Sequence, residues 1–271
     1  MKFDMGAAWN EAVRLVSANK EVLAIIAGVF FFLPSLALNV LAPATELEAA
    51  AGNPDQIRTA LMAYFSNAWP FFLMYVIATY VGTLTLYALL GKQHQPTVGE
   101  AIKIGGSALV PYIASSLIVM LGLMVTVALV AGLSAATGSV ALAVILGIAI
   151  AALFIFLSFR LVLVGPVMAI EGIYNPVAAI VRSWNLVKGN TRYLFAFVIL
   201  LALAMGVVAG VLNLVITLFG AMMGAETALW VQAIFSGLLG SAMSVLMLSV
   251  YTAIHRQLAG ATSKEDIQTF E

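Results

Sequence analysis

The chain has 271 residues, of which 63% are hydrophobic and only 9% are charged, and its formal net charge is zero. A soluble domain is about 45–50% apolar and about 25% charged, so a water-soluble fold is excluded for most of this chain and lipid is its natural solvent. Zero net charge gives no global field to attract nucleic acid, and the absence of cysteine excludes disulfides and thiolate sites.

A hydrocarbon core about 30 Å thick needs roughly 20 apolar helical residues, and six stretches meet this length. They must be helices, because isolated strands would leave backbone polar groups unpaired in lipid. The predicted spans are residues 22–42, 70–90, a segment within 108–133, a segment within 140–159 that can continue to 164, 193–219 and 228–254. A cleaved signal peptide is disfavoured for the first run, because twenty-one residues precede it and it exceeds the usual apolar core of roughly 7–15 residues.

The placement of cations predicts how the spans are oriented. Eleven of the twelve Lys and Arg residues fall on the side that also holds both chain termini, and Arg58 alone falls on the other. The eleven are Lys2, Arg14, Lys20, Lys92, Lys103, Arg160, Arg182, Lys188, Arg192, Arg256 and Lys264. The opposite loops also carry the acids Glu46, Glu48, Asp55 and Glu226. Since cytoplasmic loops carry excess cations, both termini are predicted to be cytoplasmic.

Short amphipathic segments precede the first, third and fifth spans, at residues 7–20, 97–106 and 175–188. In the third, Asn175 is a predicted N-cap, Pro176 takes the first helical position, and Gly189 supplies the stop. Its apolar stripe is Val177, Ile180, Val181, Trp184 and Val187. Trp together with Lys and Arg favours a helix lying in the cytoplasmic interface over one packed on the protein's own spans. In the second segment, Thr97 and Glu100 have capping-box spacing.

These features predict an all-α integral membrane protein, with six transmembrane helices and three cytoplasmic interfacial amphipathic helices in a single domain over residues 1–271. A threefold pseudo-repeat would divide it into residues 1–92, 93–172 and 173–271. Arg14, Lys103 and Arg182 occupy similar places in the three units. Convergence explains the pattern as well as a repeat does, since any short helix entering a membrane has this composition.

Polar residues near the fourth span form the main candidate site. Arg160 follows a full-length apolar run, Glu171 is the nearest acid, and Pro166 between them favours a bend. We therefore expect an Arg160–Glu171 ion pair across that bend. A substrate or lipid-headgroup site at Arg160 is the alternative to an arginine that snorkels to the interface, and snorkelling is favoured.

Small residues at GxxxG spacing predict close helix packing. They are Gly206 and Gly210 in the fifth span and Ser236 and Gly240 in the sixth. Packing within the chain is favoured over dimerisation. Pro34 predicts a kink in the first span. The mid-span amides Asn39 and Asn213 are expected to form hydrogen bonds between helices.

Catalytic motifs are missing from the sequence. No HExxH, P-loop, GxSxG or GxGxxG is present, and no paired carboxylates lie within a span. Neither His94 nor His255 has the spacing of a metal-ligand pair. No metal or cofactor is therefore expected, and an enzyme is disfavoured.

The stretch "FRLVLVGPVMAIEG", followed by "NPVAAIVRSWNLVKGN", resembles a bacterial membrane-domain family. This family includes the membrane domain of glycerophosphoryl diester phosphodiesterases and related stand-alone six-span proteins. Its pattern is an Arg, a Pro, an acid, a basic-Ser-Trp box and a Gly, which match Arg160, Pro166, Glu171, Arg182, Ser183, Trp184 and Gly189. The resemblance implies a bacterial inner-membrane protein. The family's fused catalytic domain uses an HRG box and an ExE acid pair, whereas this chain has "HRQ" at residues 255–257 with no ExE after it.

The leading prediction is a non-catalytic membrane protein that organises lipid or a membrane partner through its basic cytoplasmic helices. Its expected partners are membrane lipids, anionic ones in particular, and either a membrane protein or a second copy of the chain, but no nucleic acid. A small transporter or lipid-translocating protein with a site near Arg160 is the first rival, and a lipid-headgroup enzyme is the second. A cavity reaching Arg160 would favour the first rival, and a tightly packed bundle would favour the leading prediction.

Overall fold

The computed structural model describes residues 3–44, 47, 49–50, 52–91 and 96–269, and all regular structure in these ranges is helical. Six helical segments are long and apolar enough to cross a membrane, which confirms the six predicted spans. These segments are Lys20–Leu41, Gln56–Gly91, Val98–Thr137, Val140–Glu171, Thr191–Gly220 and Glu226–Gly260.

The helices follow one another with short connections. The elements are α1 (Met5–Ala18), α2 (Lys20–Ala27), the π-helical turn η1 (Gly28–Phe32), α3 (Leu33–Leu41), α5 (Pro54–Gly91), α6 (Val98–Thr137), α7 (Val140–Arg160), α8 (Val164–Pro166), the π-helical turn η2 (Val167–Glu171), α9 (Pro176–Val187), α10 (Thr191–Gly220) and α11 (Ala225–Thr269). In the first span, η1 directly precedes Pro34, and the Leu33 N–H bonds to the Gly28 carbonyl. A π-helical turn of this kind is one way in which a helix accommodates proline.

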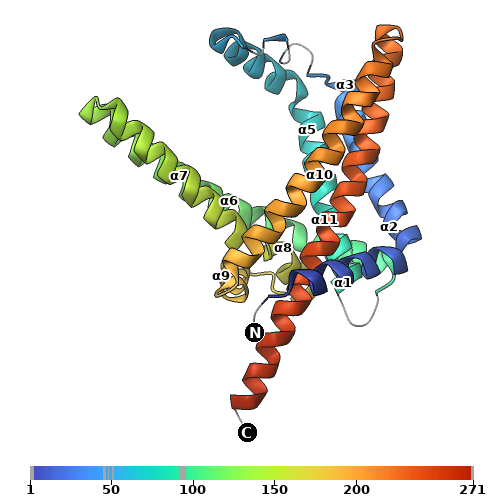
Figure 1. The fold of residues 1–271 in the computed structure, drawn as a ribbon, viewed down its shortest axis with the longest axis vertical. Coiled ribbons are helices and arrows are strands. Elements are labelled where there is room, and N and C mark those ends of the chain that lie inside the picture. Colours follow the sequence, from blue (N-terminus) through green and yellow to red (C-terminus); the bar gives the residue numbers. More distant parts are fainter. Residues whose placement is uncertain (1–2, 45–46, 48, 51, 92–95, 270–271) are drawn as a thin grey trace.

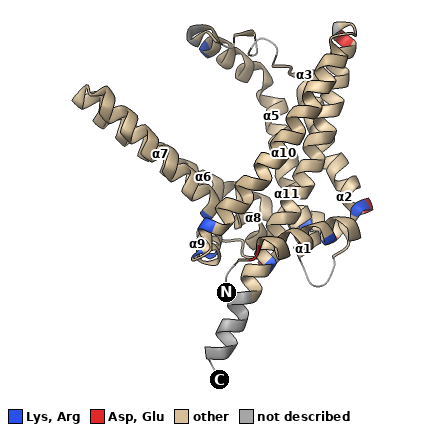
Figure 2. Ribbon diagram, viewed as in Figure 1, with Lys and Arg blue, Asp and Glu red and all other residues tan. Residues whose placement is uncertain are grey.

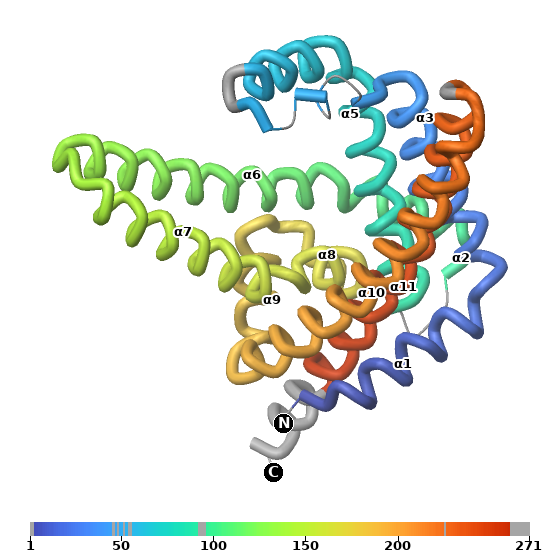
Figure 3. The backbone as a smooth tube through the Cα atoms, turned by 45° about the horizontal axis from the view of Figure 1, so that its top comes forward, coloured from blue at the N-terminus to red at the C-terminus, as the bar shows by residue number. Residues whose placement is uncertain are grey.

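Two parts of the molecule differ in how closely their helices pack (Figure 1). The helices α5, α10 and α11 form a central group together with α2 and α3, and α1 crosses α11 near one end. The α6–α7 hairpin projects away from this group, as the turned view in Figure 3 also shows. No residue of α7 is buried, so its apolar surface is left for lipid.

The buried core lies at one end of the bundle, where α1, α8, η2, α9 and the middle of α11 meet the end of α5. The largest fully buried side chains there include Leu84, Leu163, Met168, Val187 and Ile254. The other end and the hairpin expose large apolar residues, as expected of surfaces that contact hydrocarbon. The tightly packed part of the protein is therefore the part that holds the candidate site.

The segment before the third span is not a separate helix, because α6 runs without interruption from Val98 to Thr137. Its predicted capping box is confirmed by the Thr97 N–H bond to Glu100 Oε2 at 2.8 Å and by the Glu100 N–H bond to Thr97 Oγ1 at 3.3 Å. The helix continues through Gly105, where α6 crosses close to α5. A Cβ there would lie 2.5 Å from Thr85 Oγ1 and 2.9 Å from the Val81 carbonyl oxygen.

The predicted packing of small residues within the chain is wrong at three positions. A Cβ added to Gly206, Gly210 or Gly240 would meet no other atom within 4 Å. The glycine that does approach another helix in α11 is Gly237, which packs on Phe32. Ser236 bonds only to its own helix, at the Ala233 carbonyl. GxxxG spacing identifies a smooth helix face but not which face meets a neighbour.

The mid-span amides also differ from expectation. Asn39 Nδ2 donates to the Ser35 carbonyl, and Asn213 Nδ2 donates to the Ala209 carbonyl. Each amide therefore bonds one turn back along its own helix. This local bond satisfies the side-chain N–H of the amide, which lipid cannot do, so no hydrogen bond to a second helix is required.

Candidate functional site

Cations gather at the end of the bundle that holds the core (Figure 2). This end is formed by α1, α9 and the adjoining parts of α2, α6, α7, α10 and α11. The described cations in these segments are Arg14, Lys20, Lys103, Arg160, Arg182, Lys188, Arg192 and Arg256. The starts of α5 and α11, which carry Arg58 and Glu226, lie at the opposite end. Lys2, Glu46, Glu48, Lys92 and His94 fall outside the described residues, and the side chains of Asp55 and Lys264 do so too. We call the cation-rich end the basic end.

The chain leaves the fourth span by a turn directly after Arg160. The helix α7 ends at this residue, Leu161 adopts φ −105° and ψ 3°, and a new helical turn begins at Val164. Pro166 lies buried in this new turn. Proline is tolerated in a first helical turn, because the N–H groups there have no intrahelical partner. The bend therefore precedes the proline that was expected to cause it.

The expected Arg160–Glu171 ion pair is wrong, because other side chains occupy both oxygens of Glu171. Arg182 Nε lies 2.9 Å from Oε2 and its Nη2 lies 3.3 Å from Oε1. His255 Nε2 lies 2.9 Å from Oε1. Gly172, with φ +73°, reverses the chain after Glu171, so that α9 runs back past the carboxylate and presents Arg182.

Arg160 instead contacts Trp184, the aromatic residue of α9. Its guanidinium carbon lies 4.6 Å from the Trp184 ring centroid and 5.3 Å from the Phe156 ring centroid. Its Nη1 donates to the Trp184 carbonyl at 3.1 Å. Cation–π contacts of this kind strengthen as water is removed, which suits an arginine at a membrane boundary. Arg160 is thus held by a specific contact rather than extended freely to the interface.

The remaining residues of the motif complete the same structural unit. Ser183 is fully buried, and its Oγ donates to the Arg160 carbonyl at 2.9 Å. Gly189 has φ +87°, the left-handed region that lets the chain turn between α9 and α10. Lys188 is exposed just before this turn. Asn190 then accepts the Phe3 N–H at 2.9 Å, which ties the N-terminal segment to the same place.

The predicted cap and stop of α9 are confirmed, and its two faces have different surroundings. Asn175 Oδ1 accepts the Ala178 N–H at 3.0 Å, and Pro176 begins the helix. Ala179, Ser183 and Leu186 are buried against the protein. Val177 and Val181 are 58% and 52% exposed, with Trp184 half-buried beside them. The helix therefore packs on the bundle with one face and keeps part of its apolar stripe uncovered.

His255 is the residue of the cluster that sequence reasoning missed. It lies 84 residues from Glu171 and is 3% exposed, and within the described structure its Nδ1 has no hydrogen-bond partner. A helical series of polar residues along α11, Ser241, Ser249 and Thr252 before His255, is buried as well. Polar residues that recur at helical spacing in a span mark its protein-facing side, and this was the available signal.

A second ionic cluster joins α1 to α11. Glu11 Oε1 lies 2.7 Å from Arg14 Nη2 and 2.6 Å from Arg256 Nη1. The hydrogen bond from Arg14, supported by the one from Arg256, outweighs the opposing effect of burial and holds the pKa of Glu11 below its ordinary value. The cluster therefore fixes α1 across the end of α11.

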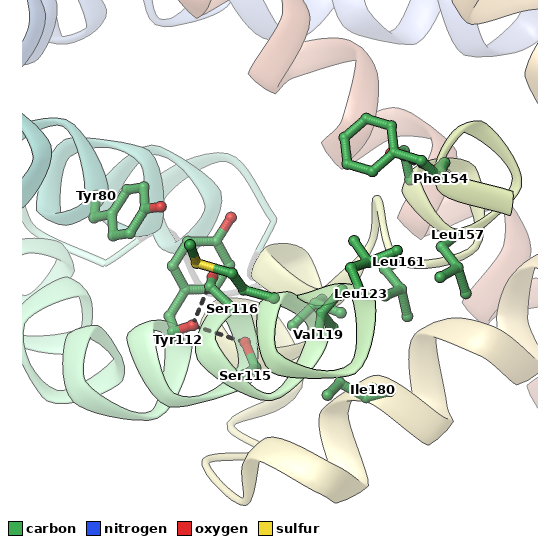
Figure 4. Close-up of a pocket in the computed structure, with 13 residues that line it drawn as sticks. Tyr80, Tyr112, Ser115, Ser116, Val119, Leu123, Phe154, Leu157, Leu161 and Ile180 are labelled. Atoms are coloured by element: carbon green, nitrogen blue, oxygen red, sulfur yellow. Dashed lines mark hydrogen bonds between the residues drawn. The ribbon is translucent and has the colours of Figure 1, made fainter. Parts of the chain in front are cut away.

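A cavity of about 530 Å³ opens where the projecting hairpin leaves the bundle (Figure 4). Its lining comes from α5, α6, α7, α9 and the turn after α7. The lining residues are Tyr80, Tyr112, Ser115, Ser116, Val119, Met120, Leu123, Phe154, Leu157, Ser158, Leu161, Val164 and Ile180. Arg160 is not among them, although Ser158 and Leu161 are. The arginine and the cavity therefore belong to different sides of the end of α7.

The geometry supports a positioning role for the motif. One carboxylate holds two basic side chains from different helices, and one arginine is held between two rings. Among the described residues, no three His, Asp or Glu side chains gather as a metal site would require. No family model, curated protein or solved structure matches the chain.

Proposed function

We propose that this chain is a non-catalytic, multi-pass membrane protein that gathers anionic lipid around its basic end. One observation carries the proposal: eight described cations lie at that end, against Arg58 at the other. Lys20, Lys103 and Lys188 are exposed there and form no ion pair with any described residue. Each such cation near an anionic membrane surface contributes about 1 kcal/mol of attraction.

The short helices at this end support the same function. Trp9 and Val13 of α1 are 37% and 43% exposed, and Val177 and Val181 of α9 are exposed more fully. Both helices are fixed in place, by Glu11–Arg256 and by Glu171–Arg182 respectively. Apolar side chains beside cations suit the boundary between acyl chains and headgroups. In this proposal, α1 and α9 lie at the cytoplasmic interface of a bacterial inner membrane, as the family resemblance implies.

The proposal is tested by the lipids that the protein retains. The chain is purified gently from native membrane, and its bound lipids are compared by mass spectrometry with those of a variant carrying Lys20→Gln, Lys103→Gln and Lys188→Gln. We expect the wild type to be enriched in anionic lipid, and the variant to lose that enrichment by about fivefold per charge removed. Arg58→Gln, at the opposite end, is the matched control and should leave it unchanged. Equal lipid composition in all three proteins would refute the proposal.

A lipid-translocating protein is the second candidate, because a cavity open to lipid lies beside α7. The cavity does not reach Arg160, whose guanidinium contacts Trp184 and Phe156, so it supplies only part of the path that this candidate needs. The two candidates differ in a vesicle assay. A translocating protein would move fluorescent phospholipid between leaflets after reconstitution, whereas a lipid-gathering protein would leave that rate at the level of protein-free vesicles.

A further inference from the structure

We infer that the cavity between α5, α6, α7 and α9 is the binding site for one lipid molecule, whose acyl chain runs along the α6–α7 hairpin. The inference goes beyond the proposed function, because it does not depend on the cations of the basic end. It starts from the exposure of the residues that line the cavity, which Figure 4 draws as sticks. Met120 and Phe154 at the outer side are 50% and 55% exposed, whereas Ser115 and Val164 on the inner side are 3% and 6% exposed. The cavity thus leads from the lipid-facing surface into the protein.

A second, wholly apolar groove continues from the same mouth. It has a volume of about 580 Å³ and shares Met120, Leu123 and Phe154 with the cavity. From there it follows α6 to Val127 and α7 to Gly147. The path from Tyr112 to Val127 covers 15 residues of α6, or about 22 Å. This exceeds the hydrocarbon depth of one leaflet, about 15 Å, and is long enough for one acyl chain.

The two ends of this path differ in chemistry. The inner cavity presents the hydroxyl groups of Tyr80, Tyr112 and Ser115, among others, and the groove presents hydrocarbon and thioether groups. The two tyrosine rings meet edge to face, with centroids 5.1 Å apart. An amphiphile with a polar end and an apolar tail matches this order.

The tyrosine hydroxyls also lack partners. Ser115 and Ser116 both donate to the Tyr112 carbonyl, at 2.7 and 3.0 Å, so the serines are satisfied. In the described structure neither the Tyr80 nor the Tyr112 hydroxyl forms a hydrogen bond. An unpaired hydroxyl beside apolar groups is unfavourable, so two donors here favour a ligand with acceptor oxygens. The ester carbonyls of a glycerolipid, at the top of its acyl chain, supply these acceptors.

The test uses the full chain in nanodiscs of phosphatidylcholine with a small fraction of a phospholipid that carries a photoreactive diazirine on its acyl chain. Adducts are mapped by mass spectrometry. We expect labelling at Met120, Leu123 and Phe154 to exceed labelling at Leu117 and Leu121 of α6, which are exposed but do not line the cavity or the groove. Equal labelling at the two sets would mean that the hairpin meets only the surrounding bilayer, and would overturn the inference. Disulfide formation between two chains of a Met120→Cys variant would also overturn it, in favour of a second copy.

Two variants sharpen the result. Ser116→Trp should fill the cavity and reduce adducts at Leu123 and Phe154 to the level of outward-facing positions, whereas Leu117→Trp, one residue along, should not. Replacing Tyr80 and Tyr112 by Phe keeps the cavity's shape and removes both donors, so we expect about tenfold weaker retention of the lipid. Retention that is unchanged in the double Phe variant would refute the role of the hydroxyls.

This experiment separates the inference from the proposed function. The nanodisc lipid is uncharged overall, so cavity labelling does not depend on attraction between cations and anionic headgroups. Cavity labelling without anionic enrichment would leave the binding site standing and refute the proposed function. Anionic enrichment without cavity labelling would do the reverse.

Discussion

At the scale of single residues, Glu171 joins two basic side chains at the basic end, and its removal should destabilise the protein. Glu171→Ala leaves Arg182 and the buried His255 without their acceptor. We expect the free energy of unfolding to fall by about 2–3 kcal/mol. Breaking a fully buried pair costs about 3–5 kcal/mol, and the effect here is smaller because a third of the Arg182 side chain is exposed. Thermal unfolding of the variants in one detergent measures it.

A double-mutant cycle supplies the control. Glu171→Ala and Arg182→Ala should together lose less stability than the sum of their separate effects, since each removes the same contact. Glu171→Ala and Arg160→Ala should add, because Arg160 contacts Trp184 and Phe156 instead. Coupling between Glu171 and Arg160 as strong as that with Arg182 would contradict the observed pairing.

Glu11 provides a pH-dependent contact at the same scale. Its pKa is lowered in the folded protein by Arg14 first and by Arg256, so its contribution to stability is complete above the ordinary pKa of a carboxyl group. That contribution is lost as the pH falls through the lowered pKa. Wild-type protein should therefore lose more stability than Glu11→Gln as the pH falls from about 5 to about 3. Parallel pH profiles of the two proteins, measured by thermal unfolding, would contradict this.

The residues of the site could be predicted from the sequence, but their partners could not. Arg160, Glu171, Arg182 and Trp184 all lie in the expected motif, where Arg160 contacts Trp184 and Glu171 contacts Arg182. Which cation meets Glu171 depends on the left-handed turn at Gly172 and on the direction of α9 after it. His255 contacts Glu171 although the two residues lie 84 positions apart in the sequence, so this contact depends on where α11 passes the other helices. Spacing in sequence carries neither kind of information.

At the scale of elements, a close helix crossing lies at Gly105, where α6 meets the backbone of α5. A Cβ there would lie 2.9 Å from a backbone carbonyl, which cannot rotate away. Gly105→Ala should therefore destabilise the protein by about 1–3 kcal/mol. The neighbouring Gly106 has no atom within 4 Å of its added Cβ, so Gly106→Ala should be neutral or stabilise by up to about 1 kcal/mol through helix propensity. Equal unfolding temperatures for the two variants would place the crossing elsewhere.

The elements themselves were largely predictable. Six spans follow from length and hydropathy, and the start of α9 follows from Asn175 and Pro176, because these signals act within a few residues. The uninterrupted α6 was not predicted, since residues 97–106 have the amphipathic pattern of a separate interfacial helix. Gly206 and Gly210 show the opposite error, because their spacing predicted a close contact between helices and an added Cβ at either position would meet no neighbouring atom within 4 Å. Composition gives a helix and its polarity, whereas contacts between helices depend on tertiary arrangement.

At the scale of the whole molecule, the separation of charge predicts how the protein sits in the membrane. The basic end carries α1, α9 and the connection between α9 and α10, and the opposite end carries the turns at residues 137–140 and 220–225. Since cytoplasmic segments are rich in Lys and Arg, Lys103 and Lys188 should face the cytoplasm, and Ala136 and Met222 should face the opposite side. All four side chains are exposed, so each position can report its own side.

The chain has no cysteine, so single substitutions at these four positions give a clean test. A membrane-impermeant maleimide applied to intact cells should label Ala136→Cys and Met222→Cys, and should label Lys103→Cys and Lys188→Cys only after the membrane is opened. Both inner positions are exposed lysines, and both outer positions lie at turns between spans, so loss of structure is not expected to protect any of them. The reverse pattern would keep six spans and invert the orientation. Labelling of Lys188 together with Met222 would contradict the topology itself, because the two residues lie at opposite ends of α10.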